Sequence, residues 1–220
     1  MSRFKISPSL ACANLVNLEK TVLELESSGT DMLHLDIEDG SFVPLLTLGT
    51  KIISDLRPLT SLPFDVHLMV NEPEFLIPDI ASSGANLISF HHEACKYPRR
   101  LLRIIKDYGI KAGIAFNPKT AISELEYLKP YIDFILLLSS EPEHKDPDFL
   151  SQTLKKVSMV RNMLPDPEID IAMDGGININ NIDDVIKSGV NVFIIGRGIF
   201  SSADFDERIR FFQNKFSLYL

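Results

Sequence analysis

The sequence Ser83-Gly84-Ala85-Asn86-Leu87-Ile88-Ser89-Phe90 joins the end of a predicted helix to a predicted buried strand. Glycine readily adopts the left-handed conformation that follows the last turn of many helices, and residues 87–90 form a short apolar run. The same signal, a Ser-Gly pair shortly before an apolar run, recurs at residues 28–31 and 188–191. The chain therefore repeats one kind of helix-to-strand connection three times.

Apolar runs of similar length recur eight times and are predicted to be strands. They span residues 5–10, 32–35, 64–69, 87–90, 111–116, 134–138, 169–173 and 192–195. Segments with the apolar spacing of amphipathic helices lie between them. Because near-continuous apolar strands are typical of a parallel sheet covered by helices, we expect an α/β fold, a single (β/α)8 barrel domain formed by residues 1–220. An open, doubly wound sheet would show the same local signals and is the alternative.

Composition and charge exclude several classes of protein. With 45% hydrophobic and 24% charged residues among 220, the chain has no signature of disorder. Its net charge of −8 argues against nucleic-acid binding, which needs clustered Lys and Arg. No apolar run approaches the roughly 20 residues of a membrane span, and the N-terminus lacks a secretory pattern, so we expect a cytoplasmic protein without a membrane partner. Cys12 and Cys95 are too few for a disulfide framework and are expected to be reduced.

Polar residues within or at the ends of three predicted strands indicate a buried site. His34 and Asp36 lie two residues apart, so strand alternation turns both to one face. His67 occupies a comparable position on the next strand, and Asp174 ends the seventh. A lone strand histidine is more often hydrogen bonded than bound to metal, but burying several such groups is costly unless they are paired or coordinated. In a barrel the four would meet at the C-terminal mouth, where barrel active sites lie.

Two imidazoles and two carboxylates suit a divalent transition metal such as Zn²⁺, Fe²⁺ or Mn²⁺. A bound dication stabilises negative charge that develops on substrate oxygens. Two carboxylates on opposite sides of a substrate could remove a proton from one face and return one to the other, which inverts a carbon centre. The remaining histidines are not expected to bind metal: His91 would pack or hydrogen bond near the mouth, His92 would lie on the opposite strand face, and His144 would lie in a loop.

Glycines after the seventh and eighth strands indicate a phosphate site. Gly175 and Gly176 follow the seventh strand, and Gly196 and Gly198 flank Arg197 after the eighth. Barrels often bind phosphate with these two loops, where glycines let backbone amides approach an anion and Arg197 would add positive charge. Each glycine alone could equally mark a turn, and Arg197 could form a surface salt bridge.

Short motifs follow one another in a characteristic order along the chain. They are Ile6-Ser7-Pro8-Ser9-Leu10, His34-Leu35-Asp36, Asp39-Gly40-Ser41-Phe42-Val43-Pro44, Asp65-Val66-His67-Leu68-Met69, Phe90-His91, Glu93-Ala94, Lys111-Ala112-Gly113, Asp174-Gly175-Gly176-Ile177, and Gly196 with Ile199-Phe200. In this order they resemble the motifs of the ribulose-phosphate 3-epimerase family. The resemblance covers essentially the whole chain.

The resemblance implies a barrel of the ribulose-phosphate-binding type and a metal-dependent isomerase. It implies a divalent ion held by four residues: His34, Asp36, His67 and Asp174. Asp36 and Asp174 would share the acid and base roles, and Ser9, His67 and Met69 match substrate-side positions. A small phosphorylated sugar as substrate and self-association into a homo-oligomer are implied as well.

The chain departs from the family pattern in a loop and at three single positions. The family's glycine-rich loop after the sixth strand is replaced by Glu141-Pro142-Glu143-His144-Lys145-Asp146-Pro147-Asp148-Phe149, whose acidic side chains would repel phosphate unless Lys145 or Arg197 offsets them. Glu38 and Leu138 stand where the family places methionines, and Arg197 replaces a serine. Glu38 could add a metal ligand, repel an enediolate or turn outward as a solvated loop acid.

The sequence therefore predicts an epimerase that inverts C3 of a ketose phosphate through an enediolate, with D-ribulose 5-phosphate and D-xylulose 5-phosphate as the first substrates to test. One alternative is an epimerase of a related ketose phosphate or of a sugar acid, because the loop and Glu38 are altered. Another is a catalytically silent barrel that serves as a binding or regulatory module. A phosphate-barrel decarboxylase is disfavoured, because the Asp-x-Lys-x-x-Asp motif of that group is absent.

Overall fold

Eight parallel strands form the centre of the structure, a computed structural model that describes residues 4–141, 148–202 and 204–219. The strands are β1 (Lys5–Pro8), β2 (Leu33–Glu38), β3 (Phe64–Met69), β4 (Leu87–His91), β5 (Lys111–Phe116), β6 (Phe134–Leu138), β7 (Asp170–Asp174) and β8 (Val192–Ile195). The predicted bounds differ from these by at most three residues. The largest extension is in β2, which runs on to Glu38 and so includes Asp36.

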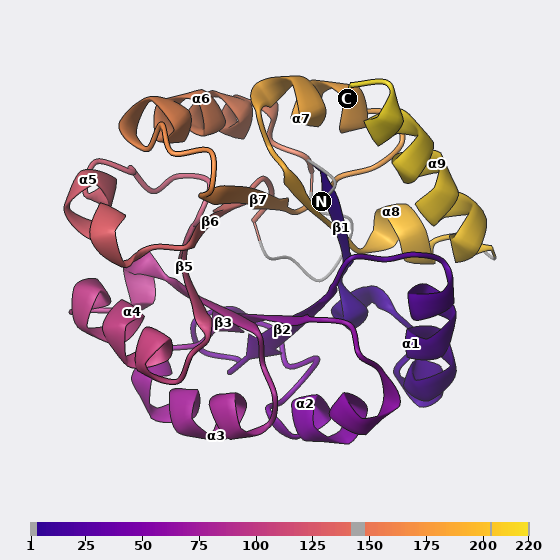
Figure 1. Cartoon of the computed structure of the whole chain (residues 1–220), viewed down its shortest axis with the longest axis horizontal. Coiled ribbons are helices and arrows are strands. Elements are labelled where there is room, and N and C mark those ends of the chain that lie inside the picture. Colours follow the sequence, from indigo (N-terminus) through magenta and orange to yellow (C-terminus); the bar gives the residue numbers. More distant parts are fainter. Residues whose placement is uncertain (1–3, 142–147, 203, 220) are drawn as a thin grey trace.

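The sheet curves into a nearly closed barrel. Neighbouring strands pair in the order β1-β8-β7-β6-β5-β4-β3-β2, and an isolated parallel bridge between Ser9 and His34 brings the end of β1 against β2. In Figure 1 the strands form a ring that the helices surround. The predicted (β/α)8 fold is confirmed. The alternative of an open sheet is wrong, because the helices cover the outside of one ring.

Helices connect the strands on the outside of the barrel (Figure 1). The α-helices are α1 (Leu18–Ser27), α2 (Lys51–Leu56), α3 (Ile77–Ser82), α4 (Pro98–Asp107), α5 (Leu125–Leu128), α6 (Leu154–Met163), α7 (Ile182–Ser188), α8 (Arg197–Phe200) and α9 (Phe205–Ser217). Short 3-10 helices are η1 (Leu10–Cys12), η2 (Leu15–Asn17), η3 (Arg57–Leu59), η4 (Pro73–Leu76), η5 (His92–Ala94), η6 (Lys129–Tyr131) and η7 (Ser151–Thr153). Within the described ranges, no helix has the length and apolarity needed to cross a bilayer.

The helix-to-strand connections predicted from the repeated Ser-Gly signal are present. Gly29, Gly84 and Gly189 follow α1, α3 and α7 with φ values of 77°, 97° and 102°. A positive φ lets the chain leave the helix and turn directly into the next strand. Cys12 and Cys95 are both free, as expected.

The apolar core has two parts, separated by the wall of the barrel. Outward-facing strand residues such as Leu35, Val66 and Ile88 pack with the helices in one large cluster. A small second cluster contains Met32, Ala115, Leu136, Ala172, Val192 and Ile194. Strand pairing sets Asp36 beside His67 on β3, and Leu138 beside Asp174 on β7. The register therefore decides which polar side chains meet at the barrel mouth.

Candidate metal centre and active site

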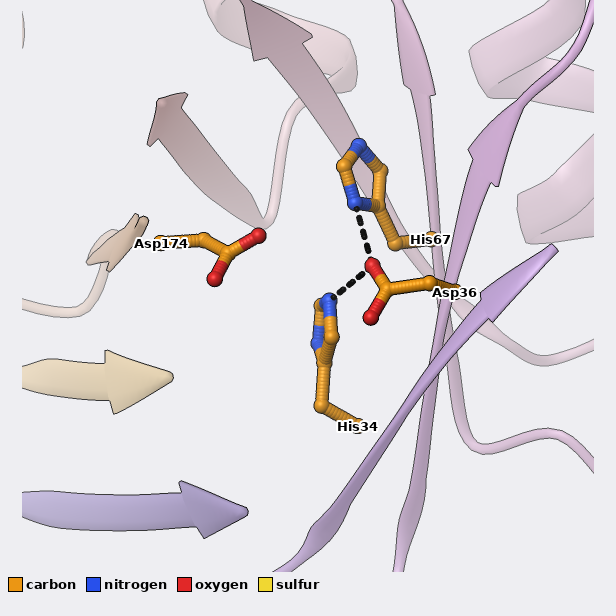
Figure 2. Close-up of side chains that lie close together, drawn as sticks. All are labelled: His34, Asp36, His67 and Asp174. Carbon is orange, nitrogen blue, oxygen red and sulfur yellow. Dashed lines mark hydrogen bonds and ion pairs between the residues drawn. The ribbon is translucent and has the colours of Figure 1, made fainter. Parts of the chain in front are cut away.

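The four predicted metal ligands converge at one end of the barrel. His34 and Asp36 project from β2, His67 from β3 and Asp174 from the end of β7 (Figure 2). One ligand atom from each residue lies within 4.8 Å of all the others. Both imidazoles are fully buried, and only 4% of Asp36 is exposed. In the described part of the chain this is the only group of His, Cys, Asp or Glu residues with the geometry of a metal site.

Asp36 lies at the centre of this group. Its Oδ1 is 3.1 Å from both His34 Nε2 and His67 Nδ1, as the dashed lines in Figure 2 show. The Ser9 hydroxyl donates a hydrogen bond of 2.7 Å to the other oxygen, Oδ2. Asp174 faces the group from the other side, and no hydrogen bond joins its carboxylate to the three other residues in Figure 2. Two carboxylates from different sides of the barrel thus border one small volume.

In each ligand imidazole, the ring nitrogen that does not face Asp36 has a hydrogen-bonding partner of its own. His34 Nδ1 lies 2.8 Å from Asp65 Oδ2. His67 Nε2 lies 2.9 Å from His91 Nε2. The predicted hydrogen-bonding role of His91 near the mouth is confirmed. The role of Asp65 was missed, although its position two residues before His67 on the same strand places both on one face.

Glu93 continues the series of hydrogen-bonding groups that leads from His67 through His91 away from the metal site. His91 Nδ1 lies 3.2 Å from Glu93 Oε2, and the Asn117 amide donates to Glu93 Oε1 at 2.8 Å. Although burial acts in the opposite direction, hydrogen bonds from His91, Thr120 and Asn117 lower the pKa of Glu93 to about 2. Burial lowers the pKa of His91 to about 4. Sequence reasoning assigned Glu93 no role, because no periodicity relates a residue in η5 to a strand.

The electrostatics of the group fit a cation. Burial opposes the charging of His34, but Asp36 and Asp65 raise its pKa well above the ordinary value. Burial likewise opposes ionisation of Asp36, but His34 and His67 hold its pKa well below the ordinary range. Burial and the charge of Asp36 together raise the pKa of Asp174 from 3.8 to about 7. Acceptor atoms therefore converge on a point where one positive charge, a proton or a metal ion, relieves their repulsion.

The chemistry of these residues matches the predicted ligand set. Two imidazoles and two carboxylates can hold Zn²⁺, Fe²⁺ or Mn²⁺, and groups that hydrogen bond the ligands from behind are a usual feature of metal sites. His92 is not part of the group. It was predicted to lie on the opposite strand face but begins η5, with Nε2 3.7 Å from Glu124 Oε2.

A cavity of about 730 Å³ opens beside the two carboxylates. Its lining includes the predicted site residues Ser9, Asp36, Glu38, Met69, Leu138, Asp174, Gly175, Gly176, Gly196 and Arg197. His67, which was also predicted to contact substrate, does not line this cavity. It is fully buried beside Asp36, which places it on the metal side of the site.

Backbone constraints shape the end of the cavity that was predicted to bind phosphate. Gly175 has a φ of 108°, and a Cβ there would lie 2.3 Å from Ser140 Oγ. At Gly196 a Cβ would meet Cys12 Sγ at 2.4 Å. Larger residues at these two positions would therefore collide with the segments that follow β6 and β1. Burial and the charges of Asp36 and Asp174 raise the pKa of Cys12 to about 11, so it remains a thiol.

Two arginines line this end of the cavity. Arg197 was predicted from its place between two glycines, whereas Arg208 comes from α9 and was not predicted. No ion pair or hydrogen bond of Arg208 is seen among the described residues. The sequence carried no signal for it, because only the packing of α9 beside α8 brings its side chain to the barrel mouth.

The altered positions of the sequence lie around the same cavity. Glu38 is not a solvated loop acid: it ends β2, is only 7% exposed, and accepts a hydrogen bond of 2.6 Å from the Thr47 amide. Leu138 is buried at the end of β6. Glu141, Asp148 and Phe149 also line the cavity. His144 and Lys145 lie outside the described residues.

Comparison with known sequences gives one consistent result. The model of the ribulose-phosphate 3 epimerase family matches residues 5–200. The chain is 37% identical to the ribulose-phosphate 3-epimerase of Escherichia coli (strain K12) over 212 residues, which cover 95% of this chain and 94% of that protein. It is 35% identical to the protein of the same name from Bacillus subtilis (strain 168) over 203 residues, covering 91% and 94%. For the Serratia marcescens protein of that name the identity is 38%, covering 93% and 99%.

Comparison with solved structures extends the similarity to more distant barrels. KGPDC from Streptococcus mutans, in a structure with a bound ligand, has a TM-score of 0.76 at 16% identity, with 99% of both chains covered. 3-Hexulose-6-phosphate synthase has a TM-score of 0.73 at 12% identity, covering 96% of this chain and 99% of that one. At these identities the similarity concerns the fold alone.

Proposed function

The chain belongs to the ribulose-phosphate 3-epimerase family, and from this premise we propose that it inverts C3 of a ketose phosphate, interconverting D-ribulose 5-phosphate and D-xylulose 5-phosphate. The observation that carries the proposal is the pair of carboxylates, Asp36 and Asp174, on different sides of one cavity. Inversion of a carbon requires one group that takes a proton from one face and another that delivers a proton to the opposite face.

The environments of the two carboxyl groups suit these unlike roles. Asp36 is held ionised by His34 and His67, whereas burial and Asp36 favour the protonated form of Asp174. In one direction, the ionised carboxylate takes the C3 proton, and the electrons of that C–H bond form a C2–C3 double bond. The π electrons of the C2 carbonyl move onto its oxygen at the same time, which gives the enediolate. The other carboxyl then donates its proton to the opposite face of C3. In the reverse direction the two residues exchange roles.

A metal ion held by His34, Asp36, His67 and Asp174 is part of this proposal, as Zn²⁺, Fe²⁺ or Mn²⁺. When bound, it would supply positive charge beside the substrate oxygens on which negative charge develops. The residues of the chain provide the rest: Ser9 orients Asp36 through its hydrogen bond, and Met69 and Leu138 exclude water from one side of the cavity.

The opposite end of the cavity is proposed to hold the substrate phosphate. Gly175, Gly176 and Gly196 line this end of the cavity without side chains of their own, and Arg197 and Arg208 contribute positive charge. The positive charges of these two arginines offset the negative charges of the carboxylates that line the same cavity. The phosphate would therefore orient the sugar with its reacting carbon beside Asp36 and Asp174.

Exchange of solvent deuterium into C3 is the direct test of this function. Protein loaded with Zn²⁺, Mn²⁺ or Fe²⁺ should incorporate deuterium at C3 of D-ribulose 5-phosphate and form D-xylulose 5-phosphate in D₂O. NMR of the recovered sugar measures both. Failure of exchange with all three metals would contradict the proposal.

A second candidate substrate is favoured by one specific observation. The buried carboxylate of Glu38 lines the cavity that would hold the sugar and lies on the same face of β2 as Asp36. A carboxylate at this position would accept a hydrogen bond from a substrate hydroxyl and so could select a different sugar. The alternative is therefore an epimerase of a related ketose phosphate or of a sugar acid. A panel of phosphorylated and unphosphorylated ketoses separates the two. Tight metal binding without turnover of any member would instead indicate a binding or regulatory module.

Three further properties belong to the proposal. Residues 1–220 are proposed to form one domain, since all eight strands join a single sheet. The enzyme is proposed to form a homo-oligomer and to act in the cytoplasm, both of which follow from its family resemblance and sequence features. Gel filtration with light scattering tests the oligomeric state.

A further inference from the structure

A buried chain of hydrogen-bonding groups leads outward from the metal site. It begins at His67 Nε2, passes through both nitrogens of His91 and ends at Glu93 Oε2, with steps of 2.9 Å and 3.2 Å. His67 and His91 are fully buried. Because no room is left for solvent at the rings, each nitrogen must either donate to its neighbour or accept from it.

The position of the protons follows from the outer end of the chain. The Asn117 amide donates to Glu93 Oε1, and the Thr120 side chain also hydrogen bonds to this carboxylate. A carboxylate has no proton to give, so His91 Nδ1 must donate to Glu93 Oε2. In a neutral His91 the other nitrogen then accepts, and His67 Nε2 must be the donor. This order leaves a lone pair on His67 Nδ1, which lies 3.1 Å from Asp36 Oδ1. Asp36 is therefore a competing acceptor for the proton of His67, and Glu93 favours the opposite tautomer through His91.

We propose that Glu93 is a positioning residue that, through His91, selects the tautomer of His67 whose unprotonated Nδ1 faces the metal site. The proposal rests on the metal site of the proposed function and assigns a role to two residues outside it. His34 shows the same arrangement in a single step, because its Nδ1 donates a hydrogen bond to Asp65 and its Nε2 faces the site. Selection of the correct tautomer in advance favours metal binding, since the alternative tautomer places an N–H where the metal must lie.

Substitution of Glu93 by Gln provides a sharp test, because it keeps the shape but changes one acceptor into a donor. The Asn117 amide would retain the side-chain oxygen of Gln, which turns the new NH₂ group towards His91 Nδ1. His91 would then donate from Nε2, and His67 would carry its proton on Nδ1, towards the site. We expect E93Q to bind Zn²⁺ about 10- to 100-fold more weakly than the wild type.

Two measurements on the full chain report this effect without any substrate. Competition with a chromophoric chelator gives the Zn²⁺ dissociation constant. The ¹⁵N chemical shifts of the imidazoles give the tautomers of His67 and His91 directly, with protonated Nε2 on His67 expected in the metal-free wild type. In metal-free E93Q the proton should move to Nδ1 of His67, a change that a merely structural role of Glu93 would not produce.

Two variants control for shape and for charge. E93D shortens the side chain but keeps an acceptor, so it should retain the wild-type tautomer and bind Zn²⁺ more tightly than E93Q does. E124Q makes the same change at a glutamate beside His92, outside the chain of buried groups, and should leave Zn²⁺ affinity unchanged. The proposal is wrong if E93Q binds Zn²⁺ like the wild type or keeps the proton on His67 Nε2. If the wild type itself binds no metal, the metal site of the proposed function fails instead.

Discussion

At the scale of single residues, the site depends on two aspartates in different surroundings. Asp36 is hydrogen bonded by Ser9 and lies against two imidazoles, whereas Asp174 has none of these partners. The pKa of Asp36 is therefore lowered and that of Asp174 is raised to about 7. Two carboxyl groups of one chemical type thus differ in their affinity for a proton, which suits an acid and base pair.

Replacement of either aspartate by asparagine should remove one half of the proton transfer. We expect D36N and D174N each to lower kcat by at least about 10²- to 10⁴-fold. A coupled assay of xylulose 5-phosphate formation, with bound metal measured on the same samples, gives the comparison. Circular dichroism shows whether each variant is folded. Full activity of either variant at full metal content would show that its carboxylate is not an acid or base.

At the scale of secondary-structure elements, the barrel brings together side chains from segments that are far apart in sequence. The loops after β7 and β8 and the helix α9 contribute to one end of the cavity. Arg208 lies on α9 among the cavity-lining residues. Arg210, two residues further along the same helix, pairs with Asp206 and has a side chain that is 71% exposed. The two arginines therefore form a natural pair for a comparison.

Substitution of Arg208 by Ala should weaken binding of the substrate phosphate. We expect R208A to raise KM about tenfold while kcat changes little, because the guanidinium would contact a group remote from the reacting carbon. Steady-state kinetics with the phosphorylated sugar measure this, with R210A as the control and R208K as a partial rescue. Equal effects of R208A and R210A would indicate loss of general surface charge rather than a specific contact.

At the scale of the whole molecule, four ligands from three strands link metal binding to folding. The strands β2, β3 and β7 carry these ligands and come together only in the closed barrel. The unfolded chain has no such site, so a bound ion stabilises the native state by mass action. Binding also requires His34 and Asp174 to lose protons, whose pKa values are raised in the metal-free protein.

Zn²⁺ should therefore raise the melting temperature, and the increase should depend on pH. At a free concentration of about 100 times the dissociation constant, the stabilisation is about 2.7 kcal/mol, or roughly 5–10 °C for a chain of this size. Protons compete with the metal at His34 and Asp174, so the increase should be larger at pH 8 than at pH 6. Differential scanning calorimetry with Zn²⁺ or a chelator measures it. A shift that persists in D36N would place the ion elsewhere.

The sequence alone determined the alternation of strands and helices, whereas strand pairing decided that they close into a barrel rather than form an open sheet. It also determined the inward positions of His34, Asp36, His67 and Asp174. These features follow from local rules, since strand periodicity and glycine conformation act over a few residues.

Only the tertiary structure decided which distant groups complete the site. Glu93 meets His91 and the Asn117 amide, Glu38 is buried against the Thr47 amide, and Arg208 reaches the cavity from α9. No local periodicity encodes these contacts, because strand register and helix packing bring their partners together across the fold.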